Sequence, residues 1–476
     1  DFGFGASLFI RPIRAVQPAG QNPAQVLHRR RKPSEIMHGD PLKPCLGDFL
    51  WAPSGLALRL LGIRISSVHS SAISPVRELV QVPQKSRRIL FTSFAIVRLS
   101  AISRARAKPV SITEPANQSE NTATPIGGVL PSQSIRRLIA DGGLFAQPGI
   151  EDEQIQPSSI DLRLGLEAYR VRASFLPGSD ASVEEKLDRM TMRRIDLTDG
   201  AVLEKGCVYV VRLMEAVSLP QNVSAVANPK SSTGRLDVFT RLITDRASEF
   251  ETVEAGYDGP LYAEISPRTF SILARAGSRL NQLRFRQGEP QVSDDAMRRL
   301  QEHTPLVHAD AGQIDIKEGV AVSVDLTGDA ETGLIGFRAN RHTGLIDIDE
   351  PGSCEVLDYW EPVYRLPGQE PGLILDPGEF YILRSKESVT VPLDHAAEMR
   401  AYDVRVGEFR AHYAGFFDPG FGVADIGGEG TRAVLEVRSH DVPFMLEDGQ
   451  TVCRLVYEPL LEVPDKIYGA SGTGSN

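Results

Sequence analysis

Apolar and polar residues alternate in short runs along most of the chain from about residue 128 onward. Runs such as CVYVVRL (207–213), YAEIS (262–266), EFYILRS (379–385) and AVLEVRS (433–439) are separated by Gly, Pro and Asp turns. A period of two is typical of strands that bury one face in a sheet. The pattern predicts a mainly β fold, a barrel or sandwich with a few short helices.

One segment near the start of this region predicts a helix instead. In GVLPSQSIRRLIADGGLF (128–145), apolar residues recur at helical spacing. Ser132 or Ser134 is the expected N-cap, and the pair Gly142-Gly143 is expected to end the helix.

The β-rich region contains an internal repeat. GCVYVVRLMEAVSLP (206–220) and GEFYILRSKESVTVP (378–392) share Gly, Tyr, Arg, Glu, Val and Pro at the same offsets. Residues 263–285 and 435–457 align without a gap as well. The period is about 172 residues, so each copy has the size of a domain rather than of a solenoid unit. We predict a first copy over residues 127–318 and a second copy over 319–476.

The first 126 residues differ in kind from the rest. They carry about 17 Lys and Arg against about 7 Asp and Glu, whereas the whole chain has a net charge of −10. Their apolar pieces lack a steady period, and the first Met is Met37. We expect residues 1–126 to be an appended, largely disordered segment, for which translation from upstream of the true start is one explanation. We interpret HRRRK (28–32) as a solvated charge run and not as a nucleic-acid arm.

Composition narrows the class of protein further. No window of 18 or more apolar residues predicts a membrane span. The four cysteines lie far apart and form no C-x-x-C pair, so neither a zinc site nor a disulfide framework is predicted: Cys45, Cys207, Cys354 and Cys453. A reducing, cytoplasmic setting fits this usage.

The stretch PKSSTGR (229–235) is the first candidate for binding chemistry. It lies between two expected strands and combines a lysine, two serines, a glycine and an arginine. Lys and Arg side chains pair with phosphate, and hydroxyl and backbone N–H groups can complete the coordination. A polar turn between strands is the alternative, so its neighbours decide the interpretation.

A second candidate is a pair of glutamates at the same repeat position. Glu264 and Glu436 each lie in an alternating apolar strand. A carboxylate there costs free energy unless it is paired or used. The alternative is that each faces solvent, and duplication alone would explain why there are two.

The order of these motifs resembles the 2′-deoxycytidine 5′-triphosphate deaminase family, within the superfamily of trimeric dUTPase-like β folds. IQPSSIDLRLG (155–165) precedes PKSSTGR, and an acidic-x-Gly turn and a strand with Glu264 follow. The resemblance covers about 128–290 well and about 320–470 more loosely. It implies two tandem dUTPase-like domains that convert dCTP and water to dUTP and ammonia without a catalytic metal.

The resemblance also implies roles for single residues. Ser231 and Arg235 match positions near the base, and Glu264 matches the glutamate that takes a proton from water and returns it. The remaining expected substrate contacts are Lys230, Ser232, Gly234, Glu254, Tyr262, Arg405, Glu436 and Tyr468. Mg²⁺ is expected on the substrate triphosphate. The motifs of zinc deaminases, H-x-E and P-C-x-x-C, do not occur.

Neither copy matches the family pattern completely. Copy one has Glu254-Ala255-Gly256 where the family usually has Asp-Pro-Gly, with about six extra residues before it. Copy two has Asp418-Pro419-Gly420, but AYDVRVG replaces the serine stretch. Sites in this superfamily form where neighbouring units meet, so we expect the two copies to act as neighbours. We take Glu264 as the working base and Glu436 as the alternative.

Two other functions stay open at this level. One is a dUTPase-like diphosphatase, and the other is a non-catalytic nucleotide-binding regulator. Tyr468 and Lys466 are candidates for a tail that closes over the nucleotide. We further expect a homo-oligomer of β units, with dTTP as a possible inhibitor and with neither nucleic acid nor membrane as a partner.

Overall fold

The computed structural model describes residues 127–469, apart from 291, 310–313, 366–367, 369–370, 402–408, 412–414, 424–429 and 440. All described residues belong to one compact unit of the chain. The prediction for residues 1–126 therefore lies outside the described residues.

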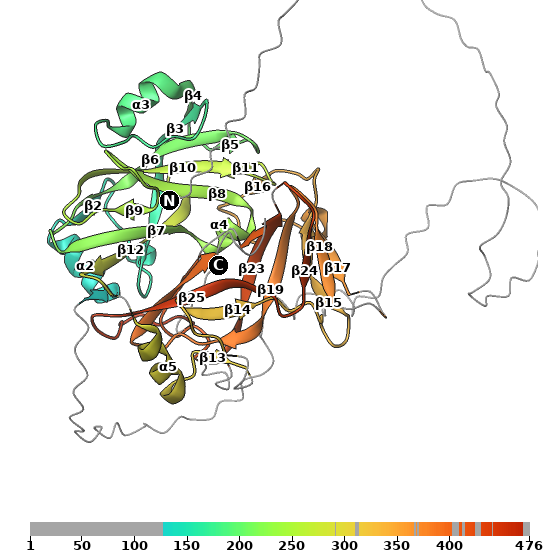
Figure 1. Ribbon diagram of the computed structural model, residues 1–476. Coiled ribbons are helices and arrows are strands. Elements are labelled where there is room, and N and C mark those ends of the chain that lie inside the picture. The colour runs from blue at the N-terminus through green and yellow to red at the C-terminus, as the bar shows by residue number, and fades with distance from the viewer. Residues whose placement is uncertain are drawn as a thin grey trace, which may run out of the picture. The chain divides into compact units, whose positions relative to one another are not determined.

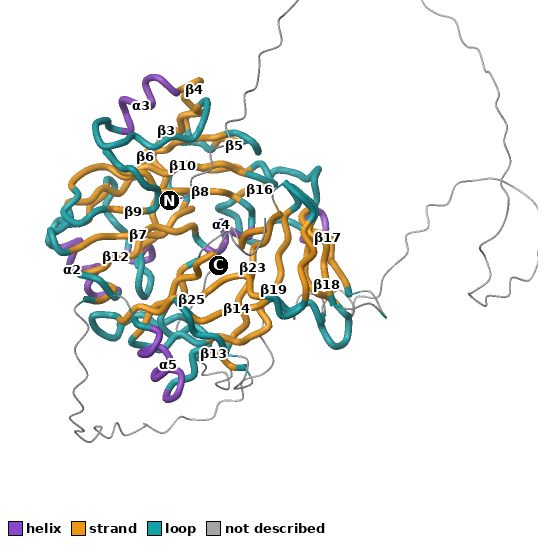
Figure 2. Tube along the Cα trace, in the orientation of Figure 1, coloured by secondary structure: helices purple, strands orange, loops and turns teal. Residues whose placement is uncertain are grey.

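Strands are the main regular element of the described chain, and the helices are few and short (Figure 2). The prediction of a mainly β fold is therefore confirmed. The elements of the first copy are β1 (Gly128–Val129), α2 (Ser132–Ala140), β2 (Leu144–Ala146), η1 (Asp152–Gln154), β3 (Ile160–Val171), α3 (Val183–Met190), β4 (Thr191–Asp196), β5 (Ala201–Leu203), β6 (Val208–Ser218), β7 (Val223–Pro229), α4 (Ser231–Arg235), β8 (Val238–Thr244), β9 (Thr252–Val253), β10 (Asp258–Pro267), β11 (Ile272–Ala274) and β12 (Arg279–Gln287).

The chain continues with elements of similar length, of which those from β14 onward lie in the predicted second copy (Figure 1). They are α5 (Asp294–His303), β13 (Val307–His308), β14 (Val320–Ser323), β15 (Leu334–Ala339), β16 (Ile346–Asp347), α6 (Val356–Tyr359), β17 (Trp360–Tyr364), β18 (Gly372–Leu375), β19 (Phe380–Val389), β20 (His395–Ala401), β21 (Phe409–Ala411), β22 (Phe416–Phe417), β23 (Thr431–Ser439), β24 (Phe444–Glu447) and β25 (Thr451–Pro459).

The two copies share one strand order. In copy one the strands run β8-β10-β6-β3, with β4 on β3, and in copy two they run β21-β23-β19-β15-β17. The pairs β12·β7 and β25·β20 also correspond. All of these pairs are antiparallel. The repeat read from the sequence is therefore a repeat of topology.

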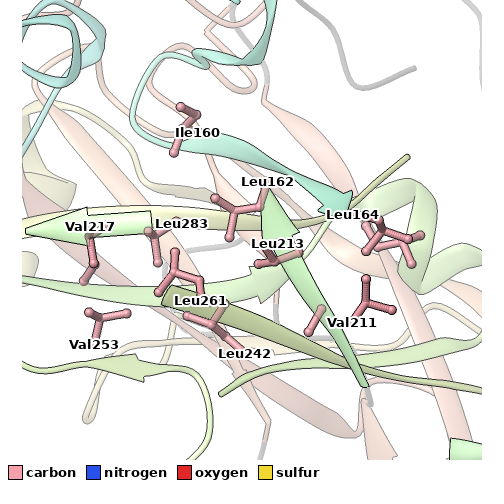
Figure 3. Packing of buried hydrophobic residues seen from close by; sticks show 14 of the residues in the cluster. Ile160, Leu162, Leu164, Val211, Leu213, Val217, Leu242, Val253, Leu261 and Leu283 are labelled. Carbon is pink, nitrogen blue, oxygen red and sulfur yellow. The ribbon is translucent and has the colours of Figure 1, made fainter. Parts of the chain in front are cut away.

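Each copy buries its own core. In copy one, alternate residues of β3, β6, β8, β10 and β12 meet, among them Leu162, Leu213, Leu242 and Leu261 (Figure 3). The second core includes Met297, Leu306 and Val307, which precede the boundary predicted at 319. That boundary itself stays a prediction.

The predicted helix at 128–145 forms as α2, but its cap differs from the prediction. Pro131 occupies the N-cap position, and no side chain caps the helix. The Ser132 hydroxyl instead donates to Asp465 in the C-terminal segment. Asp141 and Gly142, which has a φ of 77°, follow the last helical residue. No helix in the described part of the chain is both long enough and apolar enough to cross a membrane.

Buried charged groups join the two copies. Arg284 on β12 is fully buried and donates to the Ala397 carbonyl (2.9 Å) and to Ser158 (3.0 Å). Its guanidinium lies 3.8 Å from Asp418 of copy two and over the Phe416 ring. The Ser158 hydroxyl donates to Asp418 at 2.6 Å. Burial lowers the pKa of Arg284 and raises that of Asp418, so each group depends on the other for compensation.

We expect Arg284→Met to destabilise the protein by about 3–5 kcal/mol, because Asp418, whose side chain is only 15% exposed, would lose its counter-charge. The matched control is Arg338→Met, which removes a partly exposed ion pair with Glu361 and should cost at most about 1 kcal/mol. Thermal midpoints of the two full-length variants test this. Equal midpoints would show that Arg284 contributes no more than a surface charge.

Candidate functional site

The stretch PKSSTGR forms a short helix, and not an open turn. Residues Ser231–Arg235 make up α4, between β7 and β8, with Lys230 at the N-cap. Thr233 and Gly234 form the buried face of this helix, and the Thr233 hydroxyl donates to the Leu280 carbonyl at 3.0 Å. The buried face fixes α4 to β12, so the other side chains of the stretch can face the second copy.

Lys230 is held by an aspartate of the other family motif. Its Nζ lies 2.6 Å from Oδ2 of Asp161, which is buried in SSIDLRLG on β3. Gln282 donates to the same carboxylate at 3.3 Å. Asp161 also lies close enough to Asp418 to raise the pKa of that carboxyl. The motifs SSIDLRLG and PKSSTGR of copy one are thus neighbours, and the loop of copy two that carries Asp418 lies beside Asp161.

The charge of Arg235 in copy one acts on the Glu436 carboxyl of copy two. Glu436 is buried on β23, and burial raises the pKa of its carboxyl to about 7, while the positive charge of Arg235 acts in the opposite direction. Nε of Arg235 is buried without a hydrogen-bond partner among the described residues. Arg438 lies two residues after Glu436 on the same face of β23 and forms an ion pair with Asp237, which follows α4. Figure 1 shows α4 next to β23.

Glu264 lies in a different environment. It is buried on β10, where it accepts two hydrogen bonds from the directly opposite Arg241 (2.6 and 3.2 Å). The Arg241 guanidinium is stacked on the Phe250 ring at 3.5 Å. Phe250 belongs to the extra residues of copy one, and α3 packs over the same face through Val183 and Leu187. Glu264 is therefore paired with Arg241 of its own copy, whereas the positive charge that acts on Glu436 is that of Arg235.

A cavity of about 490 Å³ opens beside α4. Copy one contributes Lys230, Ser232, Arg235 and Arg279, and copy two contributes the segment from Ile346 to Trp360. Basic side chains and a serine hydroxyl suit phosphate oxygens. Three predicted binding residues thus line one cavity, whereas neither glutamate belongs to its lining.

The other predicted residues are spread over the described chain. Gly234 lies within α4, and Glu254 lines a second cavity of about 730 Å³ in copy one. Tyr262 is buried, its hydroxyl donates to Glu184 at 3.3 Å, and burial raises its pKa. The Tyr468 ring contacts Phe421 beside the Asp418 turn. Arg405 lies outside the described residues.

Two residues of the site have no strong signal in the sequence. Asp161 lies within a quoted motif, but nothing in the motif predicts its pairing with Lys230. Trp360, the first residue of β17, also lines the cavity, and no local pattern around it points to copy one. Lys466 was a candidate for closing the site, and its Nζ donates to the carbonyls of Asp152 (2.7 Å) and Ile155 (3.0 Å).

Comparisons with known proteins identify the family of this chain. Family models of the N-terminal and C-terminal domains of 2′-deoxycytidine 5′-triphosphate deaminase match residues 126–289 and 293–476. A dCTP deaminase of Natronomonas pharaonis is 30% identical over 163 residues, which cover 33% of this chain and 79% of the relative. A dUMP-forming dCTP deaminase of Sulfurihydrogenibium sp. is 29% identical over 160 residues, or 33% of this chain and 82% of the relative.

A solved structure matches both copies together. The crystal structure of 2′-deoxycytidine 5′-triphosphate deaminase from Agrobacterium tumefaciens is 54% identical, with a TM-score of 0.68, and covers 70% of this chain and 99% of that chain. Fold and site therefore define a tandem dUTPase-like β protein with a polar site between its two copies. The chain belongs to the 2′-deoxycytidine 5′-triphosphate deaminase family, as its motifs predicted.

The raised pKa of Glu436 predicts a pH dependence of stability. Its folded value of about 7 lies above the ordinary 4.5, so between about pH 4.5 and 7 the unfolded chain loses this proton first. Stability therefore falls as the pH rises through this window. We expect Glu436→Gln to gain up to ~3 kcal/mol relative to the native protein between pH 5 and pH 8.

Urea unfolding at the two pH values measures this gain. Glu361→Gln removes an exposed carboxylate of the same copy and serves as the control. An equal pH effect in the two variants would contradict the assignment of the raised pKa to Glu436.

Proposed function

We propose that this protein deaminates dCTP to dUTP and ammonia at the site between its two copies, with Glu436 as general base and acid. The observation that carries the proposal is the buried Glu436 carboxyl, with a pKa of about 7, opposite Arg235. A group with a pKa near the working pH can both accept and return a proton. The choice of Glu436 follows the alternative from the sequence, because Glu264 is paired with Arg241.

The proposed steps use the side chains of both copies. Glu436 takes a proton from a water that attacks C4 of the cytosine ring, and gives it to N3. A second proton passes from the attacking hydroxyl through Glu436 to the amino group, and the C4–N bond breaks. Water thus supplies the C4 oxygen and the N3 hydrogen of dUTP and one hydrogen of the ammonia. Arg235 and Ser231 would hold the base and the water, and charged donors there stabilise developing negative charge.

The triphosphate is proposed to lie in the cavity beside α4. Lys230, Ser232 and Arg279 line it, and Mg²⁺ would enter on the phosphate oxygens, which are the hard ligands that it prefers. We place Mg²⁺ on the phosphates and not on the acidic side chains of the lining, because Asp347 is already paired with Arg275. We extend the proposal to inhibition by dTTP, which carries the same triphosphate, to a homo-oligomer and to a cytoplasmic location.

The first test is ammonia release from dCTP by the full-length chain with Mg²⁺. We expect Glu436→Gln to lose at least about 1,000-fold in kcat, because one group serves both proton transfers. Glu264→Gln is the matched control from the equivalent strand and should stay within about tenfold of the native kcat. Loss confined to Glu264→Gln would instead place the base in copy one.

The nucleotide product separates this proposal from its alternative. Equal amounts of dUTP and ammonia are expected. Cleavage of dUTP to dUMP and pyrophosphate without ammonia from dCTP would favour a diphosphatase and overturn the deaminase proposal.

A pH profile gives a second, independent test. We expect kcat/KM for dCTP to fall below about pH 7, where the Glu436 carboxyl gains its proton. Arg235 opposes the raised pKa of Glu436, so Arg235→Met should move this acid limb to higher pH as well as reduce the rate. A limb that stays in place in Arg235→Met would separate Arg235 from the titrating group.

A further inference from the structure

The two copies use equivalent insertions in opposite ways. Between β3 and β4, residues 172–190 of copy one include α3, which packs over Tyr262 and so covers the face of Glu264. Between β15 and β17, residues 340–359 of copy two include β16 and α6. This second insertion reaches copy one, because Ile346 packs with Phe270.

The copy-two insertion is fixed to copy one by backbone and side-chain contacts. β16 pairs in parallel with β11. The Asp347 carboxylate accepts two hydrogen bonds of 2.6 Å from Arg275, one from each terminal nitrogen. Asp349 accepts from Ser278 at 2.7 Å. A bidentate pair holds both distance and orientation, so this segment has a defined position against copy one.

An aromatic cluster supports the end of the same segment. The Trp360 ring lies 5.5 Å from Phe270 of copy one and 5.8 Å from Phe380 of copy two, in edge and tilted contacts. Tyr359 contacts Phe270 in the same way, with ring centroids 5.8 Å apart. Such contacts add to the free energy of burial. Trp360 and Tyr359 both line the cavity that holds Lys230.

Charge on the opposite wall indicates which part of a nucleotide would meet the segment. Lys230, Arg235 and Arg279 all lie on the copy-one side of this cavity. Lys230 is paired with Asp161 and Arg279 with Glu151, so Arg235, whose Nε has no hydrogen-bond partner among the described residues, is the group best placed to meet an anion. Of the facing carboxylates, Asp347 and Asp349 are compensated by Arg275.

We propose that the copy-two segment Ile346–Trp360 is the second wall of the triphosphate pocket, and that the Arg275–Asp347 pair is a positioning device that sets affinity for nucleoside triphosphates. This deepens the proposed function and rests on it. The wall acts through binding, and proton transfer at Glu436 does not require it. Loss of the pair should therefore raise KM and leave kcat largely unchanged.

Trp360 supplies a readout that is independent of activity. The chain has two tryptophans, and Trp51 lies outside the described residues, so a Trp51→Phe background leaves Trp360 alone. We expect both dCTP and inorganic triphosphate to change its fluorescence in a saturable way. Deoxycytidine, which lacks phosphates, should have little effect. No response to either phosphate compound in a protein that turns over dCTP would overturn the inference and leave the deaminase intact.

The pair itself is tested by Asp347→Asn in the full-length protein. KM for dCTP and the dissociation constant from Trp360 fluorescence should each rise about tenfold, with kcat within about twofold. Arg275→Lys keeps the charge but loses the bidentate geometry and should give a smaller rise. Glu361→Gln, which breaks an ion pair next to Trp360 in sequence, should change neither constant.

Two results would overturn the positioning role. One is an unchanged KM in both Asp347→Asn and Arg275→Lys. The other is a fall in kcat with no change in KM. If neither deamination nor nucleotide cleavage occurs while Trp360 still reports saturable triphosphate binding, the proposed function fails, whereas the assignment of the pocket stands.

Discussion

The pairing of Arg438 with Asp237 ties the second copy to the helix that carries the binding stretch. Asp237 follows α4, Arg438 lies on β23, and both are buried. Side chains two residues apart on a strand share a face. The ion pair of Arg438 with Asp237 therefore also places Glu436 within reach of the charge of Arg235. A charge buried in this way is costly to separate from its partner, so the contact between the copies and the geometry of the site depend on each other.

Duplication gave both copies a buried glutamate at one strand position, and packing gave the two glutamates different surroundings. Glu264 meets Arg241 from the neighbouring strand, and Phe250 and α3 lie over that pair. Among the described residues, the positive charge that acts on the Glu436 carboxyl comes from Arg235 of copy one. Burial raises the pKa of the Glu436 carboxyl to about 7, which suits the proton transfers in both directions that we propose for it.

Much of the architecture could be predicted from local pattern. Period-two alternation gave the mainly β class, and the repeat at a fixed offset gave two copies with one strand order. The helix at 132–140 and its glycine end followed from spacing. The expected serine cap was wrong, because Ser132 donates to Asp465, a residue more than 300 positions away. A hydroxyl that can cap a helix can equally bind a distant carboxylate, and only the fold selects between the two.

The sequence by itself determined the family, the duplicated β fold and the stretch that holds Lys230, Ser231 and Arg235. These depend on residue order and on periodicity, which are local properties. Only the tertiary structure decided that the charge of Arg235 acts on Glu436 and that Arg241 forms an ion pair with Glu264. It also decided that Trp360 and Asp347 of copy two line one cavity with residues of copy one, and that Asp347 pairs with Arg275. These contacts join residues on different strands and in different copies. Their existence depends on how the two copies pack, and the two glutamate strands look alike in sequence.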